Sequence, residues 1–380
     1  MALKHTNNMS RHFSIYLDIL RFIAAIAVFM DHLTSSPFTQ GIFPRGLGAY
    51  GAIAVVIFFV LSGYVIAYVA DTREKTATQY LTARVSRLYS VIIIALFLTF
   101  TLDYFGARVN PELYGIQKVL WKPPSFEGYL ATFFLVNEYS IFDFGGILAG
   151  SNAPFWSLSF EATYYLIAGL FLFSRRFVWI PLGIIVLFLA GRTIAVLFPL
   201  WLAGFFLYRT KLASIEKSKF FSPFFLLFIA VGSVVGILTV PFICKHLPSD
   251  NFGHFFPWGR GPFNRNLIQD YLSGGLFFFH ILAMKFLLIN SKVNIKPWIE
   301  KVIRNLGAMT FPMYLIHYPL LCFLTAISPW ENNSIKHAIM LTLVCFVAVR
   351  LITPICDHFK LYLKNLCKSL NQYIDRFKQG

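Results

Sequence analysis

The fold of this protein is set by a hydrophobic stretch near its N-terminus, residues 18–32, with the sequence DILRFIAAIAVFMDH. A run of this kind predicts a membrane-spanning helix, yet it contains Arg21 and His32. A charged side chain at membrane depth costs about 2.5–3.5 kcal/mol on insertion scales, so such residues are kept mainly where function needs them. Their separation along an α-helix is three turns plus about 20°, which puts Arg21 and His32 on one face, about 16 Å apart along the axis.

The composition is that of an integral membrane protein. Of the 380 residues, 57% are hydrophobic and 13% are charged, whereas a soluble domain has about 25% charged residues. Apolar runs of about 20 residues recur along the whole chain, which is helix length rather than the alternation of a barrel strand. We therefore expect an all-α polytopic bundle of ten transmembrane helices, at about 15–33, 48–70, 88–106, 154–173, 177–190, 193–208, 222–243, 266–289, 307–327 and 338–357. The fifth and sixth are short for a bilayer.

The net charge of +16 is explained by orientation, so we expect no nucleic-acid partner. Basic residues gather in alternate connections, which ten spans place on one side, and the positive-inside rule makes that side cytoplasmic. Both termini are then cytoplasmic. We expect residues 1–357 to form the transmembrane domain and 358–380 a basic amphipathic tail on the inner leaflet. The clusters are Lys4 and Arg11; Arg73, Lys75, Arg84 and Arg87; Arg175 and Arg176; Arg209, Lys211, Lys217 and Lys219; Lys292, Lys296, Lys301 and Arg304; and the tail from Lys360.

No processing or metal signal interrupts this pattern. The first span is not followed by a small-residue cleavage site, so we expect a retained helix. The five cysteines are scattered without CxxC or metal spacing, and we expect neither a disulfide framework nor a metal site.

Arg21 and His32 have two acidic neighbours. Asp18 lies three residues before Arg21, where the two can pair on the helix, and Asp31 lies beside His32. The functional interpretation is a basic group on one side of the bilayer and a histidine on the other. The alternative is an arginine that snorkels to the inner headgroups and a histidine at the outer interface.

Two further motifs carry charge into the membrane. Arg84 and Arg87 point the same way at the cytoplasmic start of the third span, a geometry suited to phosphate, and the alternative is a basic loop that sets topology. The stretch 156–161, WSLSFE, brings Glu161 to the depth of His32. A carboxylate there can orient an imidazole, and the alternative is a structural hydrogen bond between helices.

The remaining polar residues are assigned by depth. Ser62 and Gly63 permit a close helix approach, so packing is their default role. His317 lies near mid-bilayer and must face the bundle interior. His280 and Lys285 belong to no motif and are interpreted as packing or snorkelling residues.

Six motifs in order resemble the acyltransferase 3 family of membrane-bound acyltransferases. They extend over residues 15–357: Arg21-x10-His32, FFVLSGY at 58–64, Arg84-x-x-Arg87, WSLSFE at 156–161, FPLWLAG at 198–204 and YLIHYPL at 314–320. One departure is Phe311-Pro312 before the last motif, where the family more often has a serine and an aromatic residue.

The resemblance implies an enzyme of the bacterial inner membrane that moves an acyl group, often acetyl, from cytoplasmic acyl-CoA to a glycan hydroxyl. Arg84, Arg87 and Arg21 would then hold the acetyl-CoA donor, and His32 would act as general base with Glu161 or Asp31 orienting it. The alternative of a covalent acyl-histidine is not excluded by the sequence. Family members often carry an SGNH-type hydrolase domain after the helices. None is found in this sequence, so we expect the membrane domain or a partner to complete the transfer.

The acceptor implied by the resemblance is a surface glycan or its lipid-linked precursor, such as lipopolysaccharide O-antigen. The outer loop at 244–265 gives independent support, because aromatic faces suit sugar rings and arginines suit acidic groups on glycans. Its alternative is an interfacial aromatic belt. The residues expected to bind the acceptor are Trp156, Tyr64, His317, Trp258 and Arg260.

Two other classes of function compete with the enzyme. Intramembrane His, Asp, Glu and Arg also build the proton relays of transporters, but no inverted repeat with paired broken helices is visible. A signalling or scaffold protein would leave Arg21, His32 and Glu161 without purpose.

Overall fold

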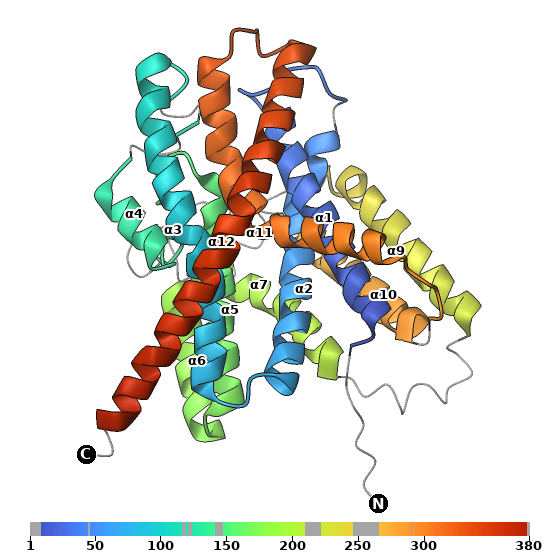
Figure 1. Ribbon diagram of the computed structural model, residues 1–380. Coiled ribbons are helices and arrows are strands. Elements are labelled where there is room, and N and C mark those ends of the chain that lie inside the picture. The colour runs from blue at the N-terminus through green and yellow to red at the C-terminus, as the bar shows by residue number, and fades with distance from the viewer. Residues whose placement is uncertain are drawn as a thin grey trace, which may run out of the picture.

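The protein is a bundle of helices (Figure 1). The computed structural model describes residues 9–44, 46–115, 119–120, 124–140, 147–209, 222–245, 266–289 and 291–377. Within these ranges nine helices are long and apolar enough to cross a membrane. They are α1 (Arg11–Thr34), α2 (Gly51–Thr72, preceded by the 3-10 turn η1, Leu47–Tyr50), α3 (Ala77–Val109), α5 (Trp156–Phe173, preceded by η3, Ala153–Phe155), α7 (Arg192–Arg209), α9 (Pro223–Cys244), α10 (Leu267–Ile289), α11 (Pro297–Ile327) and α12 (Ile335–Phe377).

Two shorter helices complete the described chain. Helix α6 (Arg176–Ala190) is apolar and has 15 residues, and α4 (Phe126–Phe133) lies in the connection between α3 and α5. Each of the ten predicted spans is therefore a helix, and the predicted all-α fold is confirmed. The pair expected to be short is α6 and α7, the latter of 18 residues.

The starts of several helices follow from local sequence. The Ser10 hydroxyl accepts a hydrogen bond from the backbone N–H of Phe13 at 3.2 Å, which caps α1. Thr76 caps α3 in the same way, and Ser222 caps α9 ahead of a proline in the first turn. Such caps satisfy backbone donors that a helix start otherwise leaves free.

Helices α11 and α12 extend beyond the predicted spans. Helix α11 begins at Pro297, ten residues before the expected start. The hydropathy pattern did not predict its first turns, because they are amphipathic rather than uniformly apolar. Figure 1 shows α11 first crossing the bundle and then turning along it. Pro312 and Pro319 inside this helix each remove a backbone N–H, the ordinary cause of such bends. The tail from 358 to 377 continues α12 without a break.

The helices around α1 form the centre of the bundle. Helix α1 packs against α2 and α11, α2 packs along α7, and α11 lies against α3 and α12. The start of α1 and the end of α12 lie at the same end of the bundle (Figure 1).

The crossing of α2 and α7 depends on two glycines. A Cβ added at Gly63 would overlap the backbone carbonyl oxygen of Trp201, and one added at Gly204 would overlap that of Val60. The two backbones touch there, which confirms the packing role predicted for Gly63.

Substitution of either glycine by alanine is expected to force α2 and α7 apart. Overpacking of this kind costs about 1–3 kcal/mol, so Gly63→Ala and Gly204→Ala should lower the melting temperature of the purified protein in detergent. Gly232 in α9 is the matched control, since an added Cβ there meets nothing within 4 Å. A Gly232→Ala variant that loses as much stability as the other two would contradict this explanation.

Candidate active site

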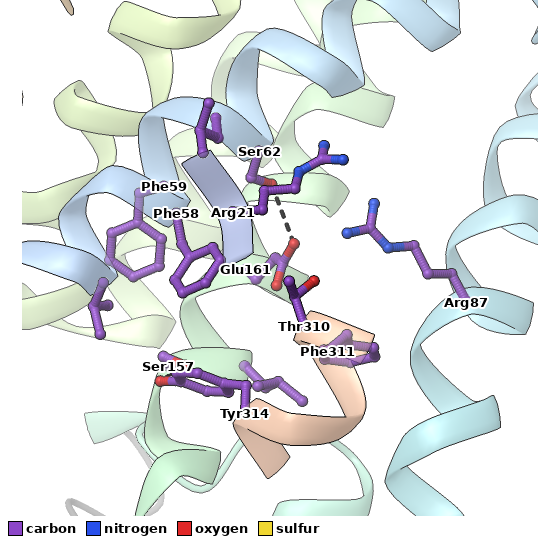
Figure 2. A pocket seen from close by; sticks show the side chains of 13 residues that line it. Arg21, Phe58, Phe59, Ser62, Arg87, Ser157, Glu161, Thr310, Phe311 and Tyr314 are labelled. Atoms are coloured by element: carbon purple, nitrogen blue, oxygen red, sulfur yellow. Dashed lines mark hydrogen bonds between the residues drawn. The ribbon is translucent and has the colours of Figure 1, made fainter. Parts of the chain in front are cut away.

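A cavity lies where α1, α2, α3, α5 and α11 meet (Figure 2). Its wall is mostly apolar, and its charged groups are Arg21 from α1, Arg87 from α3 and Glu161 from α5. In Figure 2 the Arg87 guanidinium points toward the Glu161 carboxylate, and the Arg21 side chain extends from α1 toward the side on which Arg87 lies. The other lining residues are Val55, Phe58, Phe59, Leu61, Ser62, Ser157, Leu158, Thr310, Phe311 and Tyr314.

Arg21 is held by the acidic residue one turn before it. Its Nη1 lies 3.3 Å from Oδ1 of Asp18, which confirms the predicted pair. The other Asp18 oxygen accepts a hydrogen bond from Arg304 of α11. The Arg21 side chain is thereby fixed on the face of α1 that looks into the cavity.

Glu161 is held by hydroxyl groups. Its Oε1 accepts hydrogen bonds from Ser62 Oγ at 3.1 Å and from the Tyr165 hydroxyl. The Trp201 indole N–H in turn donates to Ser62 Oγ at 3.2 Å. This chain of donors connects α5, α2 and α7 and sets the direction of the carboxylate.

The charges of the cavity wall favour an anion. Two guanidinium groups face a single carboxylate, so the wall carries a surplus of positive charge. Because guanidinium groups bind phosphate oxygens through two parallel hydrogen bonds, a phosphorylated ligand suits this arrangement.

Arg84 and Arg87 face different surroundings. Arg84 is buried, binds the Glu74 carboxylate through Nη1 and Nη2 at 3.1 and 2.6 Å, and lies 4.4 Å from the ring centre of Tyr80. Glu74 lies in the connection between α2 and α3, where burial raises its pKa and the Arg84 guanidinium opposes that shift. Of the two arginines, only Arg87 lines the cavity.

His32 lies in the last turn of α1, beyond the cavity wall. Its ring centre is 5.3 Å from that of His317 and 4.9 Å from that of Tyr318, both on α11. Among the described residues, no ion pair or hydrogen bond joins His32 to Glu161 or to Asp31. Asp31 instead lies against the start of α2, where a Cβ added at Gly51 would overlap its carboxylate.

The far wall of the cavity leads toward the histidines. The Ser157 and Tyr314 hydroxyls lie 2.7 Å apart. Tyr314 is one turn before His317 on α11, so its ring joins the cavity to the surroundings of His32. The connection before α5 is attached to the same helix, because Asn152 Nδ2 donates to the Leu315 carbonyl at 2.8 Å.

The other residues expected to bind the acceptor are spread out. Trp156 begins α5, with its ring centre 5.1 Å from that of Phe160. Tyr64 is buried between the rings of Phe13 and Tyr208. Trp258 and Arg260 lie outside the described residues.

Sequence reasoning did not identify several partners in this site. Tyr165 follows Glu161 by one helical turn, a spacing that a search for i,i+4 partners finds. Tyr314 and Ser157 lie inside the motifs at 314–320 and 156–161, which indicate no role for them. Glu74 and Asn152 lie in connections, and no periodic signal marks them.

Comparisons with known proteins identify a family for this chain. The family model described as an acyltransferase domain, that of the acyltransferase 3 family, matches residues 14–356. The chain is 29% identical over 151 residues to Acyltransferase MdmB of Streptomyces mycarofaciens, an alignment that covers 39% of this chain and 36% of that protein. It is 30% identical over 176 residues to Peptidoglycan O-acetyltransferase OatA of Listeria monocytogenes, covering 45% and 26%.

A third relative is the O-acetyl transferase of Shigella phage Sf6, 27% identical over 222 residues, covering 54% of this chain and 64% of that protein. The chain thus spans less than two thirds of the length of each of these relatives. No solved structure matches the chain. The family model nevertheless covers the whole bundle from α1 into α12, including every residue of the cavity. On this match the chain belongs to the acyltransferase 3 family of membrane acyltransferases.

Proposed function

We propose that this protein is an O-acetyltransferase that moves an acetyl group from acetyl-CoA to a hydroxyl of a bacterial surface glycan. The observation that carries this proposal is the cavity in which Arg21, Arg87 and Glu161 meet inside a family acyltransferase bundle. The reaction requires a site for a phosphorylated donor and a histidine base at some distance from it. Arg21 and His32, which meet these two requirements, both lie on α1.

The donor is bound at the cavity. Arg87 and Arg21 contact the phosphates of acetyl-CoA through charge-assisted hydrogen bonds. Glu161 keeps the two guanidinium groups apart and oriented. Arg84 contributes through its ion pair with Glu74, which fixes the start of α3 and with it the direction of Arg87.

The reaction takes place at His32. The pantetheine arm extends along α1 over the separation of about 16 Å between Arg21 and His32, which brings the thioester to the imidazole. A His32 nitrogen removes the proton of the acceptor hydroxyl while the oxygen attacks the thioester carbonyl carbon. The C–S bond then breaks, and the departing thiolate takes the proton from His32. Asp31 supports this step by holding the end of α1 against the start of α2.

The acceptor is a glycan at the outer face of the bacterial inner membrane, with lipopolysaccharide O-antigen as the proposed substrate. Two relatives are named as O-acetyltransferases, one acting on peptidoglycan and the other from a Shigella phage. These names support transfer of an acetyl group to a hydroxyl oxygen. Trp156 at the start of α5 and the loop with Trp258 and Arg260 are proposed to bind sugar rings and their acidic groups. Tyr64 shapes the donor side through its packing on α1 and α7.

The proposal is tested in two steps. Purified protein is titrated with acetyl-CoA, and envelope glycans are compared by mass spectrometry between cells with and without the gene product. The expected results are saturable binding and an acetyl mass difference on one glycan. A transporter or scaffold gives neither, and that result overturns the proposal.

His32→Ala is expected to lower the rate of transfer severely while expression and acetyl-CoA affinity stay near normal. Loss of a general base removes about 10²–10⁴-fold in rate. The measurement is transfer of radiolabel from acetyl-CoA to glycan, with binding of acetyl-CoA to the same preparation as control. A purified variant with near-normal turnover shows that His32 is not the base.

Arg87→Gln and Arg84→Gln are expected to fail in different ways. Hydrogen bonds to charged groups contribute about 1.5–3 kcal/mol, so Arg87→Gln should raise the donor KM about 10- to 100-fold and weaken its dependence on salt. Arg84→Gln leaves Glu74 buried without its partner, a loss of about 3–5 kcal/mol in stability, and should lower the melting temperature first. If the donor titration of Arg87→Gln is unchanged, Arg87 does not bind the donor and serves topology alone.

Trp258→Ala and Arg260→Ala test the outer loop. If this loop holds the glycan, both variants should acylate less glycan at a given glycan concentration, with donor affinity unchanged. Glycan acylation is measured by mass spectrometry in cells that lack the wild-type gene. Wild-type levels in both variants mean that the acceptor is held elsewhere.

A further inference from the structure

His317 is held in one tautomer. Its Nδ1 lies 2.8 Å from the carbonyl oxygen of Met313, one turn earlier on α11. A carbonyl oxygen only accepts hydrogen bonds, so Nδ1 must carry the proton. The other nitrogen of the neutral ring, Nε2, is then a bare acceptor.

That acceptor is buried without a partner. His317 is 1% exposed, and its Nε2 has no hydrogen bond among the described residues. An unsatisfied buried polar atom costs about 1–3 kcal/mol. The position therefore calls for an N–H or O–H donor.

The ring next to this acceptor belongs to His32. The two ring centres are 5.3 Å apart and the planes are inclined by 37°. Two imidazoles joined by an N–H···N bond of about 2.9 Å have centres about this far apart, so the separation of the two rings suits such a bond. Of the other rings around His317, Phe29 at 6.0 Å cannot donate, and the Tyr318 ring is nearly perpendicular to both histidine rings.

We propose that His317 is a positioning residue for His32: its Nε2 accepts the ring N–H of His32 and so fixes which His32 nitrogen is free to act as base. The inference rests on the proposed function of His32. The free nitrogen then faces the acceptor hydroxyl. When it takes the hydroxyl proton, His32 carries two N–H groups, and the second stays bonded to His317.

This arrangement does with a neutral ring what a carboxylate does in other catalytic triads. A triad carboxylate holds its histidine in one tautomer and stabilises the imidazolium, and its loss costs about 10⁴-fold. A neutral acceptor provides the orientation with less charge stabilisation. The Met313 carbonyl keeps the Nδ1 proton in place, so the chain of hydrogen bonds runs from His32 through His317 to the backbone of α11.

Two substitutions separate the two nitrogens of His317. In His317→Asn the amide reaches the Nδ1 position and keeps a donor for the Met313 carbonyl, but nothing accepts at the Nε2 position. In His317→Gln the amide oxygen reaches the Nε2 position and can accept from His32. We expect His317→Asn to lower kcat about 10- to 100-fold and His317→Gln to retain most of it. Both should leave the KM values for acetyl-CoA and for an envelope glycan extract unchanged.

The decisive control is the same substitution without His32. If His317 acts through His32, His317→Asn costs nothing further in a His32→Ala background. Equal losses in both backgrounds, equal losses for Asn and Gln, or a raised glycan KM at unchanged kcat each overturn the proposal, the last by making His317 an acceptor-binding residue. If the Asn variant does not fold, the Gln variant alone decides, because loss of its kcat at wild-type stability contradicts the proposal.

Failure of the proposed function gives a different result. Normal turnover in a His32→Ala single variant, or a wild-type protein that does not consume acetyl-CoA, would contradict the proposed role of His32 as the base. Neither result depends on His317.

Discussion

The candidate site depends on the register of α1 against α11. At one end of this pair Asp18 accepts a hydrogen bond from Arg304, and at the other the rings of His32 and His317 meet. The two contacts are separated by 14 residues on α1 and 13 on α11, in the same chain direction. A shift of one residue turns a helical side chain by about 100°, which would separate the histidines and take Arg21 out of the cavity.

The ionic groups at the start of this pair specify register more than stability. Glu300 binds Arg11 and lies 3.4 Å from Arg304, and Arg304 also binds Asp18. Exposed ion pairs contribute about 0–1 kcal/mol each. A wrong register, however, would leave carboxylates and guanidinium groups without partners at the membrane boundary. The cost of those unpaired charges excludes alternatives that apolar packing alone would tolerate.

The sequence predicts positions along the membrane normal better than directions around each helix. Hydropathy located the ten predicted spans, and spacing identified the pair of Asp18 with Arg21. Depth also put Glu161 level with His32, yet the carboxylate bonds to Ser62 and Tyr165. Depth is one coordinate, whereas the neighbours of a side chain depend on how α5 is rotated against α2. Such rotation follows from the packing of many side chains at once, and a single sequence carries no local signal for it.

Pro319 in α11 acts through contacts between helices that its sequence motif does not reveal. Pro319 has no N–H, so the carbonyl of Leu315 loses its helical partner. Asn152 donates to that carbonyl at 2.8 Å and to Thr99 Oγ1 at 2.9 Å, which joins the connection before α5 to both α11 and α3. The first turn of α5 is thereby held so that Ser157 meets Tyr314 across the cavity. A residue that weakens one helix thus creates the acceptor by which three helices are aligned, and this alignment places the carboxylate of α5 opposite the arginines of α1 and α3.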